Sequence, residues 1–152
     1  MSPSIEPVSV AMAGMLSALH RSIFHEDPWD TPAIAAIMRI AGFFGRIACE
    51  NAQPTGFVLA IDLGEECEIV SLGVLPERRR AGCGSALLAS ACQEAKRRGS
   101  RSVVLEVAVD NTAARAFYAC RGFTSVGRRP NYYGRAGCLV DALILRLALI
   151  GT

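Results

Sequence analysis

The chain has 152 residues, of which 51% are hydrophobic and 20% are charged, and its net charge at pH 7 is +2. This length predicts one domain spanning residues 1–152, and the composition favours a packed core over intrinsic disorder. A charge balance so close to neutral gives no sign of a nucleic-acid-binding protein. We find neither a signal-peptide pattern nor an apolar run of about 18 residues, so we expect a cytoplasmic protein with no membrane partner.

The cysteines give no sign of a metal site. The six cysteines stand singly at positions 49, 67, 83, 92, 120 and 138, and the chain has two histidines. Without a C-x-x-C pair or a histidine cluster, we expect no zinc site and no other metal. Cys92 and Cys120 lie among alanines in helical patterns and are expected to be small buried hydrophobic residues in a reducing compartment.

The first half of the chain predicts one strand, two helices and an antiparallel meander. Ser4–Val8 is a candidate strand, and apolar residues at helical spacing predict an amphipathic helix over Ala11–Phe24. Thr31 and Pro32 suit the N-cap and first position of a second helix that ends at Ile40. Three alternating segments then predict strands: Phe43–Cys49, Gly56–Leu63 and Cys67–Val74.

The second half predicts a helix, a strand and a helix before two final strands. The helix begins at Gly82 and stops at Gly99. A strand, a helix and a strand in this order imply parallel pairing with a right-handed crossover. The result is an α/β fold with a mixed sheet and helices on both faces. The last strand could be central or could form an edge at an interface. The remaining elements are Val103–Val107, Thr112–Arg121 capped by Asp110 or Asn111, Phe123–Arg128 and Ala142–Leu149.

A basic, glycine-bearing turn separates the third meander strand from the helix that follows it. Gly82 and Gly84 let the backbone approach an anion without a Cβ in the way, and the first N–H groups of a helix attract negative charge. The turn lacks the Walker A pattern and the third glycine of the dinucleotide fingerprint. We expect it to bind a phosphorylated cofactor, through Arg79, Arg80, Ala81, Gly82, Cys83, Gly84 and Ser85.

Two plainer interpretations of the turn remain. It could be an ordinary strand-to-helix connection with solvated arginines, or the run Arg78–Arg80 could contact nucleic acid. The second interpretation lacks the interleaved aromatic residues and the wider basic face that such contacts use.

Three motifs resemble one superfamily. The pattern R-x-x-G-x-G, formed by Arg79, Gly82 and Gly84, resembles the pyrophosphate-binding motif of the GNAT superfamily of acetyl-CoA-dependent N-acetyltransferases. The segment Leu105–Phe123 resembles its L-E-V-x-x-x-N-x-x-A-x-x-x-Y-x-x-x-G-F block. Arg128–Tyr133 is similar to the R-R-N-Y-Y of the RimI-like branch, the ribosomal-protein alanine acetyltransferases, and Pro28-Trp29 also has a counterpart in that branch. The resemblance is dense from about residue 71 to residue 141 and thin before residue 55.

The resemblance implies the GNAT fold, in which two parallel strands splay and the pantetheine arm of acetyl-CoA lies between them. It implies that the backbone of Leu72 and Val74 pairs with the pantetheine amides, and that the Val74 N–H polarises the thioester carbonyl. It also implies that the side chain of Asn111 binds this arm, although a helix cap explains an asparagine there equally well.

Two residues are candidates for acid–base chemistry. Alternation places Glu106 opposite the apolar Leu105 and Val107, where it is either a solvated carboxylate or a functional one. The resemblance aligns it with the general base of RimI-like enzymes, acting through ordered water. Tyr118 aligns with the acid that protonates the leaving thiolate. It could instead be a core tyrosine or a hydrogen-bond partner of the cofactor sulfur.

Trp29, Tyr132 and Tyr133 are candidate walls for the acceptor, or ordinary loop residues. The expected reaction is acetyl transfer to the N-terminal α-amine of a protein such as a ribosomal protein. Pro130 is inserted into the R-R-N-Y-Y pattern, a loop is expected over residues 134–138, and Val140 replaces a frequent glutamate. These departures leave the expected cofactor and reaction unchanged but keep the acceptor open, so a small amine or a lysine side chain is an alternative. A non-catalytic acyl-CoA-binding module is a further alternative, against which the presence of Glu106 and Tyr118 argues. The sequence does not predict an oligomeric state.

Overall fold

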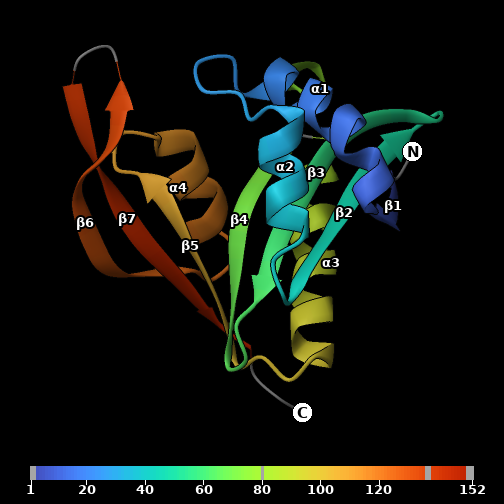
Figure 1. The fold of residues 1–152 in the computed structure, drawn as a ribbon. Coiled ribbons are helices and arrows are strands. Elements are labelled where there is room, and N and C mark those ends of the chain that lie inside the picture. Colours follow the sequence, from blue (N-terminus) through green and yellow to red (C-terminus); the bar gives the residue numbers. More distant parts are fainter. Residues whose placement is uncertain (1–2, 80, 136–137, 150–152) are drawn as a thin grey trace.

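The computed structural model describes residues 3–79, 81–135 and 138–149 (Figure 1). Within these residues, one mixed and mostly antiparallel sheet has the strand order β1-β2-β3-β4-β5-β7-β6. The strands are β1 Ser4–Pro7, β2 Phe43–Glu50, β3 Gln53–Asp62, β4 Glu66–Val74, β5 Ser102–Ala108, β6 Thr124–Arg135 and β7 Cys138–Ala148. The helices are α1 Ala13–Ile23, α2 Thr31–Met38, α3 Cys83–Arg97 and α4 Thr112–Ala119, with short 3₁₀ turns at Val10–Met12 and Pro76–Arg78.

Helices cover both faces of the sheet, as predicted. One hydrophobic cluster joins α3 and α4 to the central strands through residues such as Leu87, Tyr118 and Leu105. A second cluster joins α1 and α2 to β2 and β3, with Leu16 and Phe57 fully buried. The apolar stripe of each helix therefore explains which face it covers. The faces differ in extent, because α1 and α2 lie over β2, β3 and β4, away from β6 and β7 (Figure 1).

The parallel strands β4 and β5 separate toward their carboxyl ends. Their register runs from Glu66 opposite Ser102 to Glu68 opposite Val104, after which the two strands diverge (Figure 1). Strand β4 carries an extra residue, Val70, because Leu59 of β3 pairs with Ser71 and the next residue pairs with Ile69. A bulge of this kind bends a strand, which explains the change of direction at the point where β4 leaves β5. The splay implied by the resemblance is confirmed.

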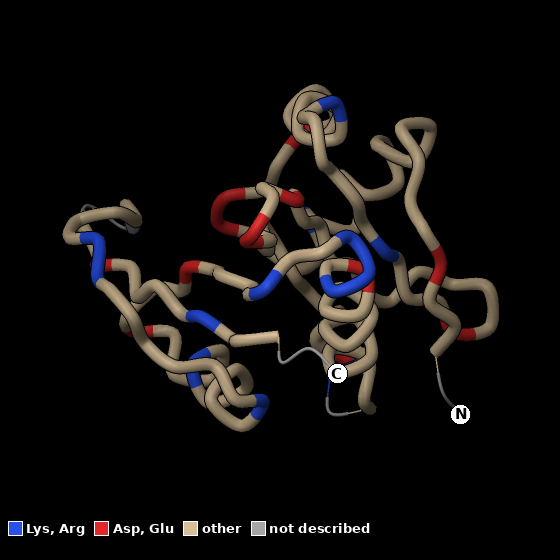
Figure 2. Tube along the Cα trace, turned by 90° about the horizontal axis from the view of Figure 1, so that it is seen from below, with Lys and Arg blue, Asp and Glu red and all other residues tan. Residues whose placement is uncertain are grey.

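A group of ion pairs around Glu94 ties α3 to the sheet through Arg46 of β2. Glu94 accepts hydrogen bonds from Arg46 of β2 at 3.3 Å, from Arg97 at 2.5 Å and from Arg98 at 2.7 Å. The hydrogen bonds from Arg97 and Arg98 lower the pKa of Glu94 to about 2. Lys and Arg are interspersed with Asp and Glu along the trace (Figure 2), and the described helices include none long and apolar enough to cross a membrane.

The start and end of α2 differ from the prediction. Asp30, not Thr31, is the N-cap, and its carboxylate accepts a hydrogen bond from the Ala33 N–H at 2.9 Å. An aspartate here satisfies a first-turn N–H, so the helix begins one residue before the predicted Pro32. The helix ends at Met38 rather than Ile40, since the next two residues form a tight turn that leads into β2.

The C-terminal hairpin is longer than predicted. Strand β6 continues past Arg128, and β7 begins well before Ala142, so most of the expected loop at residues 134–138 is paired strand. Pro130 is tolerated because β6 is an edge strand and the register shifts between Arg129 and Tyr133. Between β5 and β6 lies β7, so the last strand is central.

Asp141 stabilises the bulge that accommodates Pro130. Its carboxylate accepts hydrogen bonds from the Asn131 N–H at 2.9 Å and from Arg128 Nε at 2.6 Å. Asn131 has a φ of +53°, a conformation that asparagine tolerates better than most residues. The inserted proline therefore changes the hairpin locally without ending the strand.

The expectation of a buried Cys120 is wrong. Cys92 is half-buried, but Cys120 follows the last turn of α4 and is exposed. Two residues correspond to about 200° of helical rotation, so Cys120 points away from the core into which Tyr118 is packed.

Candidate active site

The N-terminus of α3 is an open cradle of backbone N–H groups. Gly82 is its N-cap, with a φ of +85°, and a Cβ at this position would meet no protein atom within 4 Å. The first intrahelical bond runs from the Ala86 N–H to the Gly82 carbonyl at 3.0 Å, so the N–H groups of Cys83–Ser85 precede it. Ala81 is exposed beside them, and Arg80 lies outside the described residues. The cradle fits a phosphate group.

Side chains around the cradle have structural partners. Cys83 is buried with its sulfur 3.6 Å from the Thr55 hydroxyl, so it can contribute only its backbone to a ligand. A Cβ at Gly84 would lie 3.3 Å from the ring of Phe117, and glycine therefore permits the close packing of α3 against α4.

Arg121 was not among the predicted site residues. Its guanidinium lies 3.8 Å from the centroid of the Phe117 ring and donates a hydrogen bond to the Ser85 hydroxyl. It therefore links the end of α4 to the cradle. In the sequence, Arg121 directly precedes Gly122-Phe123, the end of the segment that resembles the superfamily. This position could have indicated a role in the site, but an arginine there also suits a helix C-terminus.

The backbone of β4 presents donors and acceptors to the splay. Hydrogen-bonded and non-hydrogen-bonded pairs alternate along an antiparallel ladder, and the Leu75 N–H donates to the Thr55 carbonyl at 2.8 Å. Val74 and Leu72, one and three positions earlier, therefore direct their backbone groups away from β3, toward β5. Arg79 Nε donates to the Val74 carbonyl at 3.2 Å, which leaves the Val74 N–H directed at the gap.

Glu106 lies on the face of β5 away from α3, as its alternation predicts. Leu105 and Val107 are buried, whereas the Glu106 side chain is 17% exposed. Its Oε1 is 2.8 Å from Nη2 of Arg129, whose guanidinium lies 4.8 Å from the centroid of the Tyr132 ring. Arg129 was not predicted as a site residue. The register of β6 against β7 brings it to Glu106, and the sequence does not reveal that register.

Glu68 is a second half-buried carboxylate at this place. It pairs with Val104, two residues before Glu106 on the same face of β5. Burial raises the pKa of Glu68, the negative charge of Glu106 raises it further, and Arg129 opposes both effects. Glu68 was missed, although it interrupts an apolar strand in the same way as Glu106.

Tyr118 is a core residue whose ring packs between two phenylalanines. It is 7% exposed, with ring centroids 5.1 Å from Phe117 and 5.3 Å from Phe123. Burial raises the pKa of Tyr118 to about 12, so its phenol is a weaker acid than that of an exposed tyrosine. Asn111 is the N-cap of α4, where its side-chain oxygen accepts a hydrogen bond from the Ala114 N–H at 3.2 Å.

The predicted acceptor walls come from two segments at the splayed end of the sheet. Trp29 is half-buried, stacks on His20 with ring centroids 4.7 Å apart, and donates its backbone N–H to His20 Nδ1 at 3.0 Å. Tyr132 is 47% exposed and meets Tyr133 edge to face at 4.9 Å. The α1–α2 connection and the β6–β7 hairpin lie at the end where β4 and β5 diverge (Figure 1).

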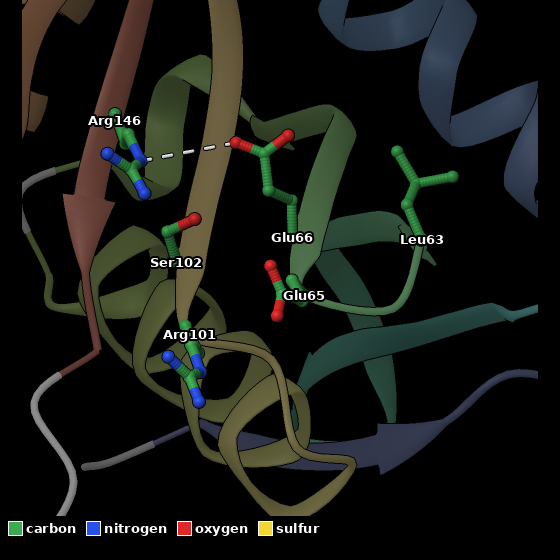
Figure 3. Close-up of a pocket in the computed structure, with 6 residues that line it drawn as sticks. All are labelled: Leu63, Glu65, Glu66, Arg101, Ser102 and Arg146. Atoms are coloured by element: carbon green, nitrogen blue, oxygen red, sulfur yellow. Dashed lines mark ion pairs between the residues drawn. The ribbon is translucent and has the colours of Figure 1, made fainter.

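A cleft of about 520 Å³ lies at the opposite end of β4 and β5 (Figure 3). Its lining includes Glu66, Ser102 and Arg146, which belong to the first residues of β4 and β5 and the last part of β7. Glu66 and Arg146 are 4.0 Å apart and half-exposed. This cleft lies where the two strands are paired rather than splayed, and it shares no lining residue with the candidate active site.

The cradle, the backbone edge of β4 and the carboxylate on β5 are parts that an acyltransferase using a coenzyme A thioester would need. The sequence model of the acetyltransferase (GNAT) family matches residues 13–123. The chain therefore belongs to this family and is an acetyl-CoA-dependent N-acetyltransferase.

Its relatives include bacterial enzymes named [ribosomal protein bS18]-alanine N-acetyltransferase. The one from Escherichia coli K12 is 32% identical over 125 residues, which cover 82% of this chain and 84% of the relative. The one from Haemophilus influenzae is 33% identical over 101 residues, covering 63% and 68%.

Solved structures agree with the fold. The crystal structure of the ribosomal-protein-S18-alanine N-acetyltransferase from Escherichia coli has a TM-score of 0.89 at 25% identity, covering 98% of this chain and 96% of that chain. A structure of yncA from Salmonella typhimurium, solved with its cofactor acetyl-CoA, has a TM-score of 0.81 at 21% identity, with 100% and 96% covered.

Proposed function

We propose that this enzyme transfers the acetyl group of acetyl-CoA to the N-terminal α-amine of a protein, such as a ribosomal protein, by direct attack within a ternary complex. The observation that carries the proposal is the position of Glu106, a half-buried carboxylate on β5 beside the splay. The Escherichia coli relative, named for alanine acetylation of a ribosomal protein, supports this acceptor class.

The donor would lie along the cradle and the splay. The exposed Ala81 and Gly82, with the backbone N–H groups of Cys83–Ser85, would hold the pyrophosphate. Leu72 and Val74 would pair with the pantetheine arm through their backbone. The side-chain oxygen of Asn111 is used as a cap, which leaves its amide nitrogen to donate. Acetyl-CoA supplies a thioester carbonyl that an amine can attack.

The acceptor must lose a proton before it can attack. An α-amine has an ordinary pKa of about 8, against about 10.4 for lysine, so a protein N-terminus is the easier acceptor to deprotonate. Glu106 would take this proton through ordered water. Tyr118, whose phenol is protonated at neutral pH like that of any tyrosine, would donate a proton to the departing thiolate.

The acceptor peptide would enter between the α1–α2 connection and the β6–β7 hairpin, beside Trp29, Tyr132 and Tyr133. The bulge at Pro130 reshapes this side of the entrance. This bulge is the observation that favours a second candidate acceptor, a small amine or a lysine side chain.

A paired kinetic comparison tests the acceptor class. We expect a peptide with a free N-terminal alanine to have a higher kcat/KM than the same peptide blocked at its N-terminus and bearing a lysine. A preference for the lysine peptide, or for a small polyamine over both, would reject the N-terminal acceptor and leave the acetyltransferase activity standing.

A further inference from the structure

Glu68 lies where the parallel strands separate. It forms the last pair of the β4–β5 ladder with Val104, and Glu106 follows two residues later on the same face. Neighbouring strands lie about 4.8 Å apart and two residues advance a strand by about 6.6 Å, so the two Cα atoms are roughly 8 Å apart. At this diagonal distance, two glutamate side chains can reach the same ligand atom.

The two carboxylates have different partners. Arg129 contacts Glu106 at 2.8 Å, whereas Glu68 has no ion pair within the described part of the chain. Arg146, which pairs with Val104 from β7, is 4.0 Å from Glu66. The single guanidinium of Arg129 beside the carboxylates of Glu68 and Glu106 therefore leaves these three groups with a net charge of −1. The raised pKa of Glu68, caused by burial and then by Glu106, fits a carboxylate that lacks a cation of its own.

We propose that Glu68 and Glu106 act as one carboxylate pair, which binds the acceptor as its ammonium ion and takes up the proton that the ammonium loses. A net charge of −1 complements the single positive charge of a primary ammonium. The inference rests on the proposed function, because it requires an amine acceptor that arrives protonated.

Acetyl transfer from acetyl-CoA to an ammonium ion releases one proton overall. The ammonium gives one proton to the pair, which later releases it to water, and the neutral amine attacks the thioester carbonyl carbon. As the C–N bond forms and the C–S bond breaks, the nitrogen loses a second proton, which balances the one that converts the leaving thiolate to a thiol. Burial and the charge of Glu106 raise the pKa of Glu68, so this carboxylate accepts a proton more readily near neutral pH than an ordinary glutamate does.

Matched substitutions on one strand test the pair. Glu68→Gln removes the charge and keeps the shape, and Glu66→Gln makes the same change two residues earlier, in the cleft of Figure 3. We expect Glu68→Gln to lower kcat/KM for the alanine peptide about tenfold or more at pH 7, because a general base contributes about 10²–10⁴-fold. The loss should shrink above a pH of about 8, where the amine is already neutral. Glu66→Gln should match the wild type, and CoA affinity by calorimetry should not change in either variant.

A variant with both Glu68→Gln and Glu106→Gln tests whether the two carboxylates share the proton. If the proton is shared, adding Glu68→Gln to Glu106→Gln should cost much less than Glu68→Gln alone. The proposal is overturned if Glu68→Gln behaves like Glu66→Gln, if its loss is the same at every pH, or if the two losses multiply. A wild type that rejects the alanine peptide would refute the proposed acceptor instead, and the same variants would then be assayed on the primary amine that the wild type accepts.

Discussion

Replacing Gly82 with alanine would separate ligand binding from backbone strain. Gly82 and Gly99 flank α3 with φ values of +85° and +98°, and at both positions a Cβ would meet no protein atom within 4 Å. A non-glycine residue in this conformation costs about 1–2 kcal/mol. Each kcal/mol lowers the Tm of a domain of this size by about 2–4 °C, so Gly82→Ala and Gly99→Ala should both melt about 2–8 °C below the wild type.

The two variants should differ in cofactor affinity. At Gly82 the new methyl group stands in the cradle, where it would keep a phosphate away from the first N–H groups of α3. Losing one hydrogen bond to a charged group costs about 1.5–3 kcal/mol, which corresponds to a roughly ten- to hundredfold higher Kd for CoA. Gly99 lies at the other end of the helix, so Gly99→Ala should bind CoA like the wild type.

Calorimetric titration with CoA and thermal unfolding of the three proteins complete the test. Unchanged affinity in folded Gly82→Ala, or an equal loss in Gly99→Ala, would refute the assignment of the cradle. Gly84 is a poorer probe, because a side chain there would press on Phe117 and disturb the packing of α3 on α4 as well.

Three further outcomes concern acid–base chemistry. Glu106→Gln should lower kcat/KM about 10²-fold or more below a pH of about 8 and recover in part at higher pH; a profile parallel to that of the wild type would contradict a base role. Tyr118→Phe should lower kcat without recovery at high pH, and unchanged turnover would leave Tyr118 a packing residue only. Because the folded state raises the pKa of Tyr118 to about 12, against about 10 when unfolded, the wild type should lose stability between these two pH values. Denaturant unfolding should show no such loss from this residue in Tyr118→Phe.

The sequence was sufficient to predict residues of the candidate active site whose role depends on their immediate neighbours in the chain. Gly82 could be placed in the turn because an anion cradle needs a residue without a Cβ, and Glu106 could be placed outside the core because strand residues alternate. The same alternation would have found Glu68. The cap of α2 was misplaced by one residue, since Asp30 and Thr31 are both good N-caps and only the hydrogen bond to Ala33 distinguishes them.

Contacts that depend on strand register could not be predicted from the sequence. The ion pair between Arg129 and Glu106 requires β7 to lie between β5 and β6, and it requires the register shift that follows Arg129. The conformation of Asn131, together with its hydrogen bond to Asp141, sets that shift. Neither partner is close to the other in the chain, so no local pattern could predict the pairing.

The late position of β7 in the chain has a consequence for synthesis. β5 pairs with β4 at three positions only, and β6 meets the sheet through β7 alone. Until Cys138–Ala148 has been made, a growing chain therefore carries the strand of Glu106 almost unpaired, and its exposed edges are open to wrong partners. The N-terminal half of the sheet can assemble before β7 has been made, but the candidate active site beside β5 can form only after it.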